Sequence, residues 1–282
     1  MQKIFDPSSI HSKMILRGKP IQEAEFPELK KRCDNLARLK SRPIKLCIIV
    51  VGDNPATTSY LNAKKVACEK VGIEFVLIRF QLDTTQEIII ETVRSLNNQC
   101  DVDGILIQLP LPPSLNSNLI MEQNHKDVDG LNNVKGILPC TPQGIMKLLT
   151  YYGISVDGKD VVIVGRSNIV GKPLALLMLE ADATVTICHS KTINLIEHTR
   201  RADIVISAIG KANFFGETDF KKGSCIIDVG TNRDENGKLC GDVRFNEMLG
   251  HCISPVPGGV GPMTVLSLIE NVIKLAELDA PS

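Results

Sequence analysis

The stretch Asp160–Pro173 constrains the fold more than any other part of this sequence. It begins with four β-branched apolar residues, Val161–Val164, which are too few for a helix and suit a strand buried on both faces. Gly165 ends this run, and a segment of helical composition begins near Gly171 with Pro173 in its first turn. A strand, a glycine turn and a helix predict a unit of a parallel α/β sheet. Backbone N–H groups and the helix dipole at such a turn bind pyrophosphate groups.

The glycine spacing differs from the common dinucleotide motif, because Ser167 stands where a second glycine is usual. The same pattern also suits a buried strand and a packed helix without a ligand. The next predicted strand, 183–188, ends where an NAD site places an acidic residue, but His189, Ser190 and Lys191 follow instead. Arg166, Ser190 and Lys191 offer donors and positive charge to a ribose 2′-phosphate, which predicts NADP. The alternative is that Ser190 and Lys191 lie in a solvated loop.

Composition excludes several classes of function. The chain has 282 residues, room for one large or two medium domains, and its 32 basic and 32 acidic residues give no electrostatic reason to expect nucleic acid or an anionic membrane as a partner. No apolar run approaches the ~20 residues of a membrane span, and the first residues lack a signal-peptide core, so we expect a cytosolic protein that acts on a small molecule. Nine cysteines without a C-x-x-C pair and five histidines without ligand spacing predict reduced thiols and no metal.

Strand-like and helix-like segments alternate along the chain. Residues 1–42 are expected to be helical. The predicted strands are 45–52, 72–78, 104–112, 161–164, 183–188, 202–210 and 224–230, and the later predicted helices are 56–71, 85–98, 143–152 and 265–278. This alternation is typical of parallel α/β sheets, and the proline-rich residues 139–142 predict a link between two α/β domains.

The helix predicted at 56–71 carries Lys64 as the only charge on its apolar face. At 100° per residue, one stripe of this helix contains Tyr60, Ala63, Lys64, Ala67, Cys68 and Val71. A partly desolvated lysine loses its proton more readily, which favours a general base near neutral pH. The alternative is a lysine whose ammonium group reaches solvent or an anionic partner from the helix edge. Tyr60, one turn earlier, is placed to stack on a flat ligand.

Three further candidates lie at predicted strand ends and turns. Gln108 stands at the carboxyl end of a predicted strand, where ligands of parallel sheets bind, and is a ligand contact, a partner for Lys64 or a cap for loose backbone. The turn 126–130 offers Asp127 and Asp129, and one of these carboxylates can accept a bidentate pair from a ring edge. A turn of this sequence also forms without any bound ligand, however. Residues 255–264 are rich in glycine and proline, so their backbone suits close approach to another group.

Six motifs occur in a fixed order over nearly the whole chain. They are Tyr60-x-x-x-Lys64, QLPLP at 108–112, KDVDG at 126–130, PCTP at 139–142, GRSNIVGKP at 165–173 and PVPGGVGPMT at 255–264. Together they resemble the FolD family of bifunctional methylenetetrahydrofolate dehydrogenase/methenyltetrahydrofolate cyclohydrolases. The resemblance implies NADP-dependent oxidation of 5,10-methylenetetrahydrofolate to 5,10-methenyltetrahydrofolate, followed by hydrolysis to 10-formyltetrahydrofolate. These reactions belong to one-carbon metabolism and purine biosynthesis.

The resemblance also implies how the chain is organised. Similar proteins are cytosolic homodimers whose last helix returns to the first domain. Residues 1–145 with 265–282 are therefore expected to form a parallel-sheet catalytic and folate-binding domain. Residues 146–264 are expected to form a Rossmann-like NADP-binding domain, with a cleft between the two.

Matching positions imply roles for individual residues. Lys64 is the catalytic lysine, Gln108 positions it, Tyr60 stacks on the folate and Asp129 binds the pterin ring. The implied catalytic and folate-binding residues are Tyr60, Lys64, Gln108, Asp129, Pro257, Gly258 and Gly259. The implied NADP-binding residues are Gly165, Arg166, Ser167, Ile169, Ser190 and Thr231. One departure is that the segment between Gly130 and the PCTP motif is shorter than the family pattern, so the loop beside Asp129 differs.

Two other functions fit the same residues. One is another two-domain NADP-dependent dehydrogenase with a lysine base, similar to shikimate dehydrogenase, which acts on a hydroxy acid and does not need the Asp129 turn. The other is a dinucleotide sensor that binds NADP and catalyses nothing.

Overall fold

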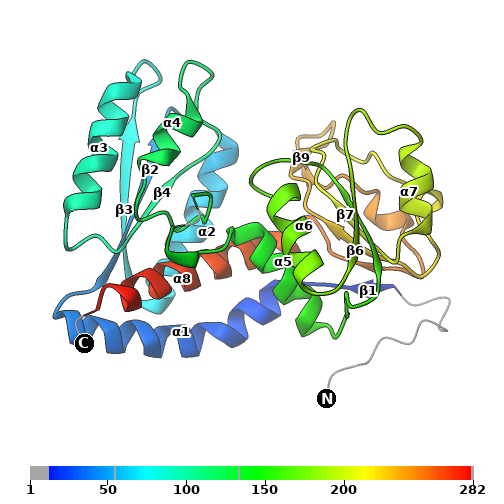
Figure 1. The fold of residues 1–282 in the computed structure, drawn as a ribbon, viewed down its shortest axis with the longest axis horizontal. Helices are drawn as coiled ribbons and strands as arrows, with labels where there is room; N and C mark the ends of the chain where they lie inside the picture. Colours follow the sequence, from blue (N-terminus) through cyan, green and yellow to red (C-terminus); the bar gives the residue numbers. More distant parts are fainter. Residues whose placement is uncertain (1–12, 54, 133, 281–282) are drawn as a thin grey trace. The chain divides into compact units, whose positions relative to one another are not determined.

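The computed structural model describes residues 13–53, 55–132 and 134–280, which divide into two compact units (Figure 1). Residues 23–140 and 265–280 surround a three-stranded sheet, and residues 13–22 and 141–264 surround a six-stranded sheet. We call these the three-stranded unit and the six-stranded unit. The division falls inside three helices, α1 (Lys19–Lys40), α5 (Cys140–Tyr151) and α8 (Val260–Leu278). It differs from the predicted boundaries because residues 13–22 and 141–145 belong to the six-stranded unit.

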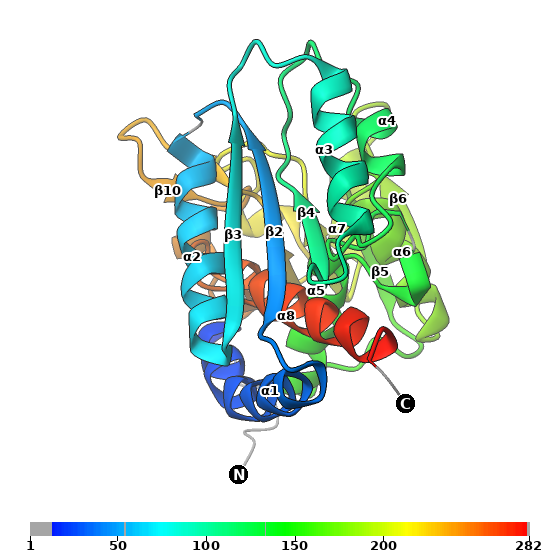
Figure 2. The same ribbon diagram turned by 90° about the vertical axis from the view of Figure 1, so that its left-hand side faces the viewer.

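The three-stranded unit alternates strands and helices, as the sequence predicts. Its strands are β2 (Ile44–Val51), β3 (Ile73–Phe80) and β4 (Gly104–Ile107), all parallel in the order β3-β2-β4 (Figure 2). The helices between and after them are α2 (Pro55–Val71), α3 (Gln86–Asn98) and α4 (Ser117–Glu122). Alternate residues of β2, such as Ile49, share a buried core with Ile89 and Val93 of α3. Burial on both faces explains why β2 reads as a continuous apolar run.

The six-stranded unit is a parallel sheet in the order β1-β11-β8-β7-β5-β6. These strands are β1 (Met14–Ile15), β5 (Asp160–Val164), β6 (Thr184–Cys188), β7 (Ile204–Ser207), β8 (Cys225–Asp228) and β11 (Cys252–Ile253). The helices α6 (Gly171–Glu180) and α7 (Leu195–Arg201) follow β5 and β6, and β9 (Asn232–Arg233) pairs antiparallel with β10 (Leu239–Cys240). Short 3-10 turns of this unit lie at Glu217–Asp219 and Phe245–Glu247, and another, Val134–Gly136, belongs to the three-stranded unit. β5 is an interior strand, as its sequence predicts.

Several element boundaries differ from the sequence prediction. Met14–Ile15 is a strand, not a helix, because it pairs with β11, a long-range contact that local pattern does not reveal; residues 1–12 of the predicted helix lie outside the described residues. β4 ends at Ile107, and a cis peptide bond before Pro110 follows. The helices α5 and α8 begin three and five residues earlier than predicted, since each has a proline in its first turn, where no intrahelical N–H bond is lost.

No helix among the described residues has the length and apolar character that a membrane crossing requires.

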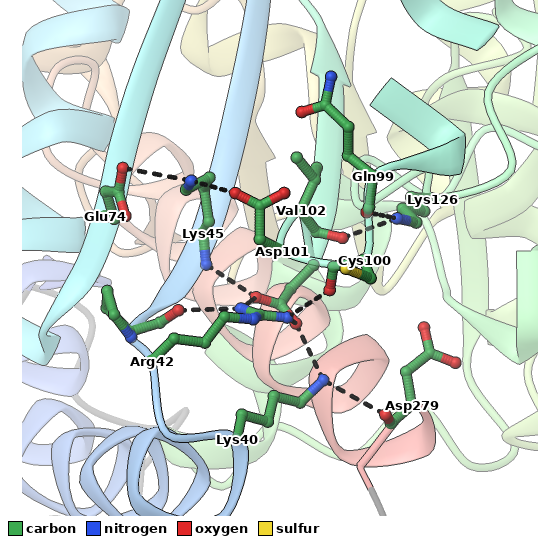
Figure 3. Close-up of polar contacts among 12 residues, drawn as sticks. Lys40, Arg42, Lys45, Glu74, Gln99, Cys100, Asp101, Val102, Lys126 and Asp279 are labelled. Atoms are coloured by element: carbon green, nitrogen blue, oxygen red, sulfur yellow. Dashed lines mark hydrogen bonds and ion pairs between the residues drawn. The ribbon is translucent and has the colours of Figure 1, made fainter. Parts of the chain in front are cut away.

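A group of ion pairs joins the end of α1 to the start of β4 (Figure 3). At its centre is Asp103, whose side chain is 2% exposed and accepts hydrogen bonds from Arg42 Nη1 at 2.6 Å and Lys40 Nζ at 3.0 Å. The backbone N–H of Lys45 donates to the same carboxylate at 2.9 Å. Burial acts to raise the pKa of Asp103, but these hydrogen bonds outweigh it and hold the pKa below its ordinary value.

Replacing Asp103 with asparagine is expected to lower the free energy of unfolding at pH 7 by about 1–3 kcal/mol, because buried donors lose a charged acceptor. A lowered pKa means that the folded state favours the ionised carboxylate, so this contribution is present above the unfolded pKa of about 4 and lost as the pH falls below it. Urea unfolding at pH 7 and pH 3 should therefore show a smaller difference between wild type and Asp103→Asn at pH 3. Asp101→Asn, at the more exposed neighbour that pairs with Lys45, is the matched control and should have a small effect. An equal loss at both pH values would contradict the ionic origin.

Candidate functional site

Helix α2 places Lys64 on its buried face. The Lys64 side chain is 8% exposed, and Ala67, Cys68 and Val71 of the predicted stripe are buried with it. Tyr60 is half-buried one turn earlier, whereas Ala63, predicted on the same stripe, is exposed. The opposite face carries the exposed residues Asn62, Lys65 and Glu69, as predicted. The amphipathic pattern of α2 thus brings an amine into the interior of the three-stranded unit.

Gln108 is the hydrogen-bond partner of Lys64. It is the first residue after β4, and its backbone N–H donates to the carbonyl of Ile49 on β2 at 2.9 Å. The Gln108 amide nitrogen donates to the Leu109 carbonyl at 2.8 Å, which directs its carbonyl oxygen toward Lys64. Lys64 Nζ donates to that oxygen at 2.9 Å. Of the three alternatives for Gln108, the structure shows a side chain held by the strand end and paired with the lysine.

The electrostatic surroundings of Lys64 oppose its charge. Burial lowers the pKa of the Lys64 amine from its ordinary value, and the nearby carboxylate of Asp129 offsets part of this effect. Gln108 is neutral and contributes an oxygen without a charge. The amine therefore loses its proton at a lower pH than an exposed lysine, which is the property that a general base needs.

The turn that carries Asp129 is built by Asp127. The Asp127 carboxylate is fully buried and accepts the backbone N–H groups of Asp129 at 3.0 Å, Leu131 at 2.6 Å and Asn132 at 3.0 Å. Because Asp127 is engaged with the backbone, Asp129 is the carboxylate of this turn that remains for a ligand. Gly130 has φ +75°, and a Cβ there would lie 2.3 Å from the carbonyl oxygen of Leu138, so only glycine fits.

Cys140 is a residue of this site that sequence reasoning missed. It is buried, its backbone N–H donates to the Asp129 carbonyl at 3.1 Å, and its thiol donates to the Val128 carbonyl at 3.3 Å. Burial raises the pKa of the Cys140 thiol well above its ordinary value, and the Asp129 charge adds to this effect. The thiol therefore stays protonated. Its place inside the PCTP motif was the available signal.

The glycine turn after β5 has the geometry that the sequence predicts. Gly165 has φ +131°, and a Cβ there would lie 2.5 Å from the Ala208 carbonyl oxygen. A Cβ on Gly171, the first residue of α6, would lie 2.1 Å from the carbonyl oxygen of Gly165. Both glycines are therefore required for the strand and helix to approach each other, and the turn leaves the N-terminus of α6 beside the carboxyl end of β5.

The predicted 2′-phosphate residues follow neighbouring strands. Val164 of β5 is in register with Cys188 of β6, and Gly165 N donates to the Cys188 carbonyl at 2.9 Å. Arg166 and Ser190, each two residues after these ends, are both exposed. This part of the six-stranded unit can therefore present a guanidinium and a hydroxyl group to one anionic ligand.

The other predicted cofactor residues lie at the same edge. The Ser167 hydroxyl oxygen accepts the backbone N–H groups of Val170 at 3.1 Å and Gly171 at 3.4 Å, so this side chain stabilises the turn itself. Ile169 in the same turn is exposed, as is Thr231, three residues after β8. A cofactor contact of these three side chains stays a prediction.

Two buried carboxylates that sequence reasoning missed, Asp228 and Asp242, hold the backbone at this edge of the six-stranded sheet. Asp242 accepts the Ser207 hydroxyl and the backbone N–H groups of Ile209 and Lys211, each at 2.9 Å. Asp228 accepts the backbone N–H groups of Asp242 at 3.0 Å and Val243 at 2.9 Å, and burial raises the pKa of Asp228 to about 7. The two carboxylates hold the segments that follow β7 and β8, where Thr231 is located.

Pro257, Gly258 and Gly259 belong to the six-stranded unit, whereas Lys64 and Gln108 belong to the three-stranded unit. The peptide bond before Pro257 is cis, and Gly258 has φ +104°. A Cβ on Gly259 would lie 2.7 Å from the carbonyl oxygen of Pro255. The Gly258 carbonyl accepts the backbone N–H of Gly18 at 2.9 Å. The segment is thus a tight backbone loop immediately before α8.

An open cavity of about 660 Å³ lies at the opposite edge of the six-stranded sheet, where β5, β7 and β8 begin. Its lining includes Lys159, Asp203, Lys221 and Ser224, and none of the residues predicted for the site. The candidate residues are at the carboxyl ends of the strands, the edge at which parallel sheets bind ligands.

Within the described ranges, no group of three or more histidine, cysteine, aspartate or glutamate side chains is arranged to hold a metal ion.

Two family models match the chain. The one described as tetrahydrofolate dehydrogenase/cyclohydrolase, catalytic domain, matches residues 16–129. The one described as tetrahydrofolate dehydrogenase/cyclohydrolase, NAD(P)-binding domain, matches residues 139–280. A curated relative, the bifunctional protein FolD of Methanoculleus marisnigri, is 46% identical over 278 residues, which are 94% of this chain and 97% of the relative.

Solved structures show the same similarity. The bifunctional FolD enzyme of Campylobacter jejuni superposes with a TM-score of 0.90 at 42% identity, covering 95% of this chain and 99% of the other. A Trypanosoma brucei FolD complexed with NADP cofactor and inhibitor has a TM-score of 0.89 at 32% identity, covering 94% and 98%. Shikimate 5-dehydrogenase of Thermus thermophilus, which represents one alternative prediction, shares only the fold, with 13% identity and a TM-score of 0.54.

Proposed function

Since this chain belongs to the FolD family of tetrahydrofolate dehydrogenases/cyclohydrolases, we propose that its buried Lys64, paired with Gln108, acts on a folate-bound one-carbon group. The enzyme oxidises 5,10-methylenetetrahydrofolate with NADP and hydrolyses the 5,10-methenyl product to 10-formyltetrahydrofolate. The observation that carries the proposed role is the amine with lowered pKa hydrogen-bonded to a neutral amide. A silent sensor gives no reason for this pair, and a hydroxy-acid dehydrogenase with a lysine base gives no reason for the Asp129 turn.

Lys64 acts through its neutral form. The oxidised one-carbon bridge carries a delocalised positive charge between two nitrogens, and a protonated lysine beside it would oppose that charge. A neutral amine instead accepts a proton from the water that adds to the bridge carbon, after which the ring opens. Gln108 holds the amine in place with its carbonyl oxygen, and its amide nitrogen donates to the Leu109 carbonyl. General-base help of this kind contributes roughly 10²–10⁴-fold to a rate.

The folate is bound by residues from two parts of the chain. Tyr60, one turn before Lys64 on α2, stacks on a ring of the folate. Asp129 accepts hydrogen bonds from the pterin edge, a role that Asp127 cannot fill because its oxygens bind backbone N–H groups. Pro257, Gly258 and Gly259 line the folate slot, where the absence of bulky side chains permits close approach.

The residues of the six-stranded unit fit NADP. Gly165 and Gly171 form a turn that no larger residue allows, at the N-terminus of α6, where a pyrophosphate is stabilised. Arg166 and Ser190 bind the 2′-phosphate, and Ser167, Ile169 and Thr231 contribute to the remaining contacts. When bound, NADP supplies the acceptor for the hydride that leaves the folate.

One assay tests the function. The protein is mixed with NADP and 5,10-methylenetetrahydrofolate, and NADPH and methenyl absorbance are followed together. Both should appear, and the methenyl signal should then decay through hydrolysis. A hydroxy-acid dehydrogenase would give neither signal with the folate, and a sensor would bind NADP without any spectral change.

We also propose that the enzyme is a homodimer. β6 is an edge strand of the six-stranded sheet, and α6, which precedes it, exposes Leu176 and Leu179 by 62% and 61%. Ile187 on β6 itself is also exposed, so an apolar surface lies next to an unpaired strand edge. Sedimentation equilibrium should give twice the mass of one chain, and Leu176→Lys should shift the distribution toward the monomer. A monomeric wild type would contradict the proposal.

The cytosol is the proposed compartment. All nine cysteines lie within the described residues and are free thiols, seven of them buried. Proteins of oxidising compartments commonly pair such residues as disulfides. The measurement is a titration of thiol groups in protein that is denatured without reductant. Nine reactive thiols per chain support a reducing compartment.

A further inference from the structure

Asn271, in the middle of α8, makes an unusual set of contacts with the turn that carries Asp129. It is buried, and its amide nitrogen donates to the Val128 carbonyl and to the Leu138 carbonyl, each at 2.9 Å. The same nitrogen lies 3.4 Å from the sulfur of Cys140. None of the six motifs includes Asn271, and an asparagine inside a helix does not by itself indicate a function.

The two carbonyl groups that Asn271 binds lie on the two arms of one loop. Val128 directly precedes Asp129, whereas Leu138 is at the end of the segment that leaves the turn and returns to α5. A single amide group with two hydrogens therefore sets the spacing between the arms. The tight fit at Gly130, where a Cβ would meet the Leu138 carbonyl, shows that the arms have no room to approach further.

Asp129 is held from two other directions as well. Its N–H donates to the Asp127 carboxylate at 3.0 Å, and its carbonyl accepts the Cys140 N–H at 3.1 Å. These bonds fix the Asp129 backbone, one within the turn through Asp127 and one to Cys140, the first residue of α5. Asn271 connects both arms of the loop to a separate element, α8, which also donates from the exposed Lys274 to the Gly136 carbonyl at 2.8 Å. This helix packs beneath β4, where a Cβ on Gly104 would lie 3.5 Å from Val272 (Figure 2).

We propose that Asn271 is a positioning residue that places the Asp129 carboxylate for folate binding and for its effect on Lys64. This inference rests on the proposed function of Asp129. It assigns to the C-terminal helix a direct part in substrate affinity.

The first test separates positioning from general stability. Asn271→Leu keeps the approximate size of the side chain and removes both donated hydrogen bonds. We expect the KM for methylenetetrahydrofolate to rise about tenfold while the KM for NADP stays within about twofold. The matched control is Ser267→Ala, one turn earlier on α8, where the buried hydroxyl oxygen has no hydrogen-bond partner among the described residues. It should leave both KM values unchanged.

The second test is a double-mutant cycle with Asp129→Asn. If Asn271 acts through Asp129, then Asn271→Leu in the Asp129→Asn background should raise the folate KM by less than about twofold further. The acid limb of the hydrolysis rate should also move to lower pH in both single variants, because Asp129→Asn removes, and Asn271→Leu displaces, the negative charge that opposes deprotonation of Lys64. Independent, multiplying effects on the folate KM would overturn the proposal.

The outcomes distinguish the proposal from its premise. Wild-type protein without folate turnover would refute the proposed function, and an unchanged KM in Asp129→Asn would refute the role of Asp129. With both premises intact, a wild-type folate KM in Asn271→Leu would refute positioning by Asn271. If Asn271→Leu does not fold, Asn271→Ser, which keeps one donor, should show an intermediate KM, and a wild-type value there would equally overturn the proposal.

Discussion

Replacing Lys64 with methionine is expected to abolish cyclohydrolase activity, lowering the rate of methenyltetrahydrofolate hydrolysis by at least about a hundredfold. Methionine keeps an unbranched apolar stem of similar length on the buried face of α2 but has no nitrogen to accept a proton. The hydrogen bond to Gln108 is lost as well. Stopped-flow decay of methenyl absorbance measures the hydrolysis directly, and NADP binding by calorimetry should remain near normal.

Lys65→Met is the matched control for this experiment. Lys65 is the next residue on α2 and is exposed, so its loss should leave hydrolysis unchanged. In the wild type, the hydrolysis rate should rise as the pH increases through the lowered pKa of Lys64, because only the deprotonated amine accepts a proton. Hydrolysis at the wild-type rate in Lys64→Met would refute the assignment of the base.

Arg166→Ala should lower the affinity for NADP by about 10- to 100-fold, which is the effect of one hydrogen bond between charged groups. It should change the affinity for NAD only slightly. The reason is that NAD lacks the 2′-phosphate that the exposed guanidinium after β5 is proposed to bind. KM values for both cofactors, measured at saturating folate, give the ratio. Arg200→Ala on α7, which removes an arginine bound to the Thr218 carbonyl, is the control and should alter neither KM.

An equal loss of affinity for NADP and NAD in Arg166→Ala would remove the argument for the 2′-phosphate. The arginine would then be a contact to a group that both cofactors share, such as the pyrophosphate. The comparison is informative because the glycine turn itself stays intact in this variant.

The parts of the fold and site that could be predicted from sequence are those with a local pattern. The apolar stripe of α2 indicates the burial of Lys64, and the end of an apolar strand places Gln108 at the edge of the sheet. Because β2 and β4 are adjacent parallel strands, both ends meet at one edge, and the Lys64–Gln108 hydrogen bond follows from that arrangement.

The residues that sequence reasoning missed act through long-range contacts. Asn271 and Cys140 lie 131 positions apart, and the Asp242 carboxylate binds Ser207 from 35 positions away. No periodicity or spacing in the sequence predicts such a pair, because each residue by itself is also common in helices or loops without a functional role. The strand Met14–Ile15 was missed for the same reason, because its partner is β11.

The discontinuity of the three-stranded unit has a consequence for biosynthesis. After residue 22 a ribosome makes residues 23–140, then the whole segment 141–264, and only then the portion of α8 that completes the three-stranded unit. Until that end emerges, the carbonyl groups of Val128 and Leu138 lack Asn271. The nascent chain therefore cannot finish its three-stranded unit before its six-stranded unit has been translated.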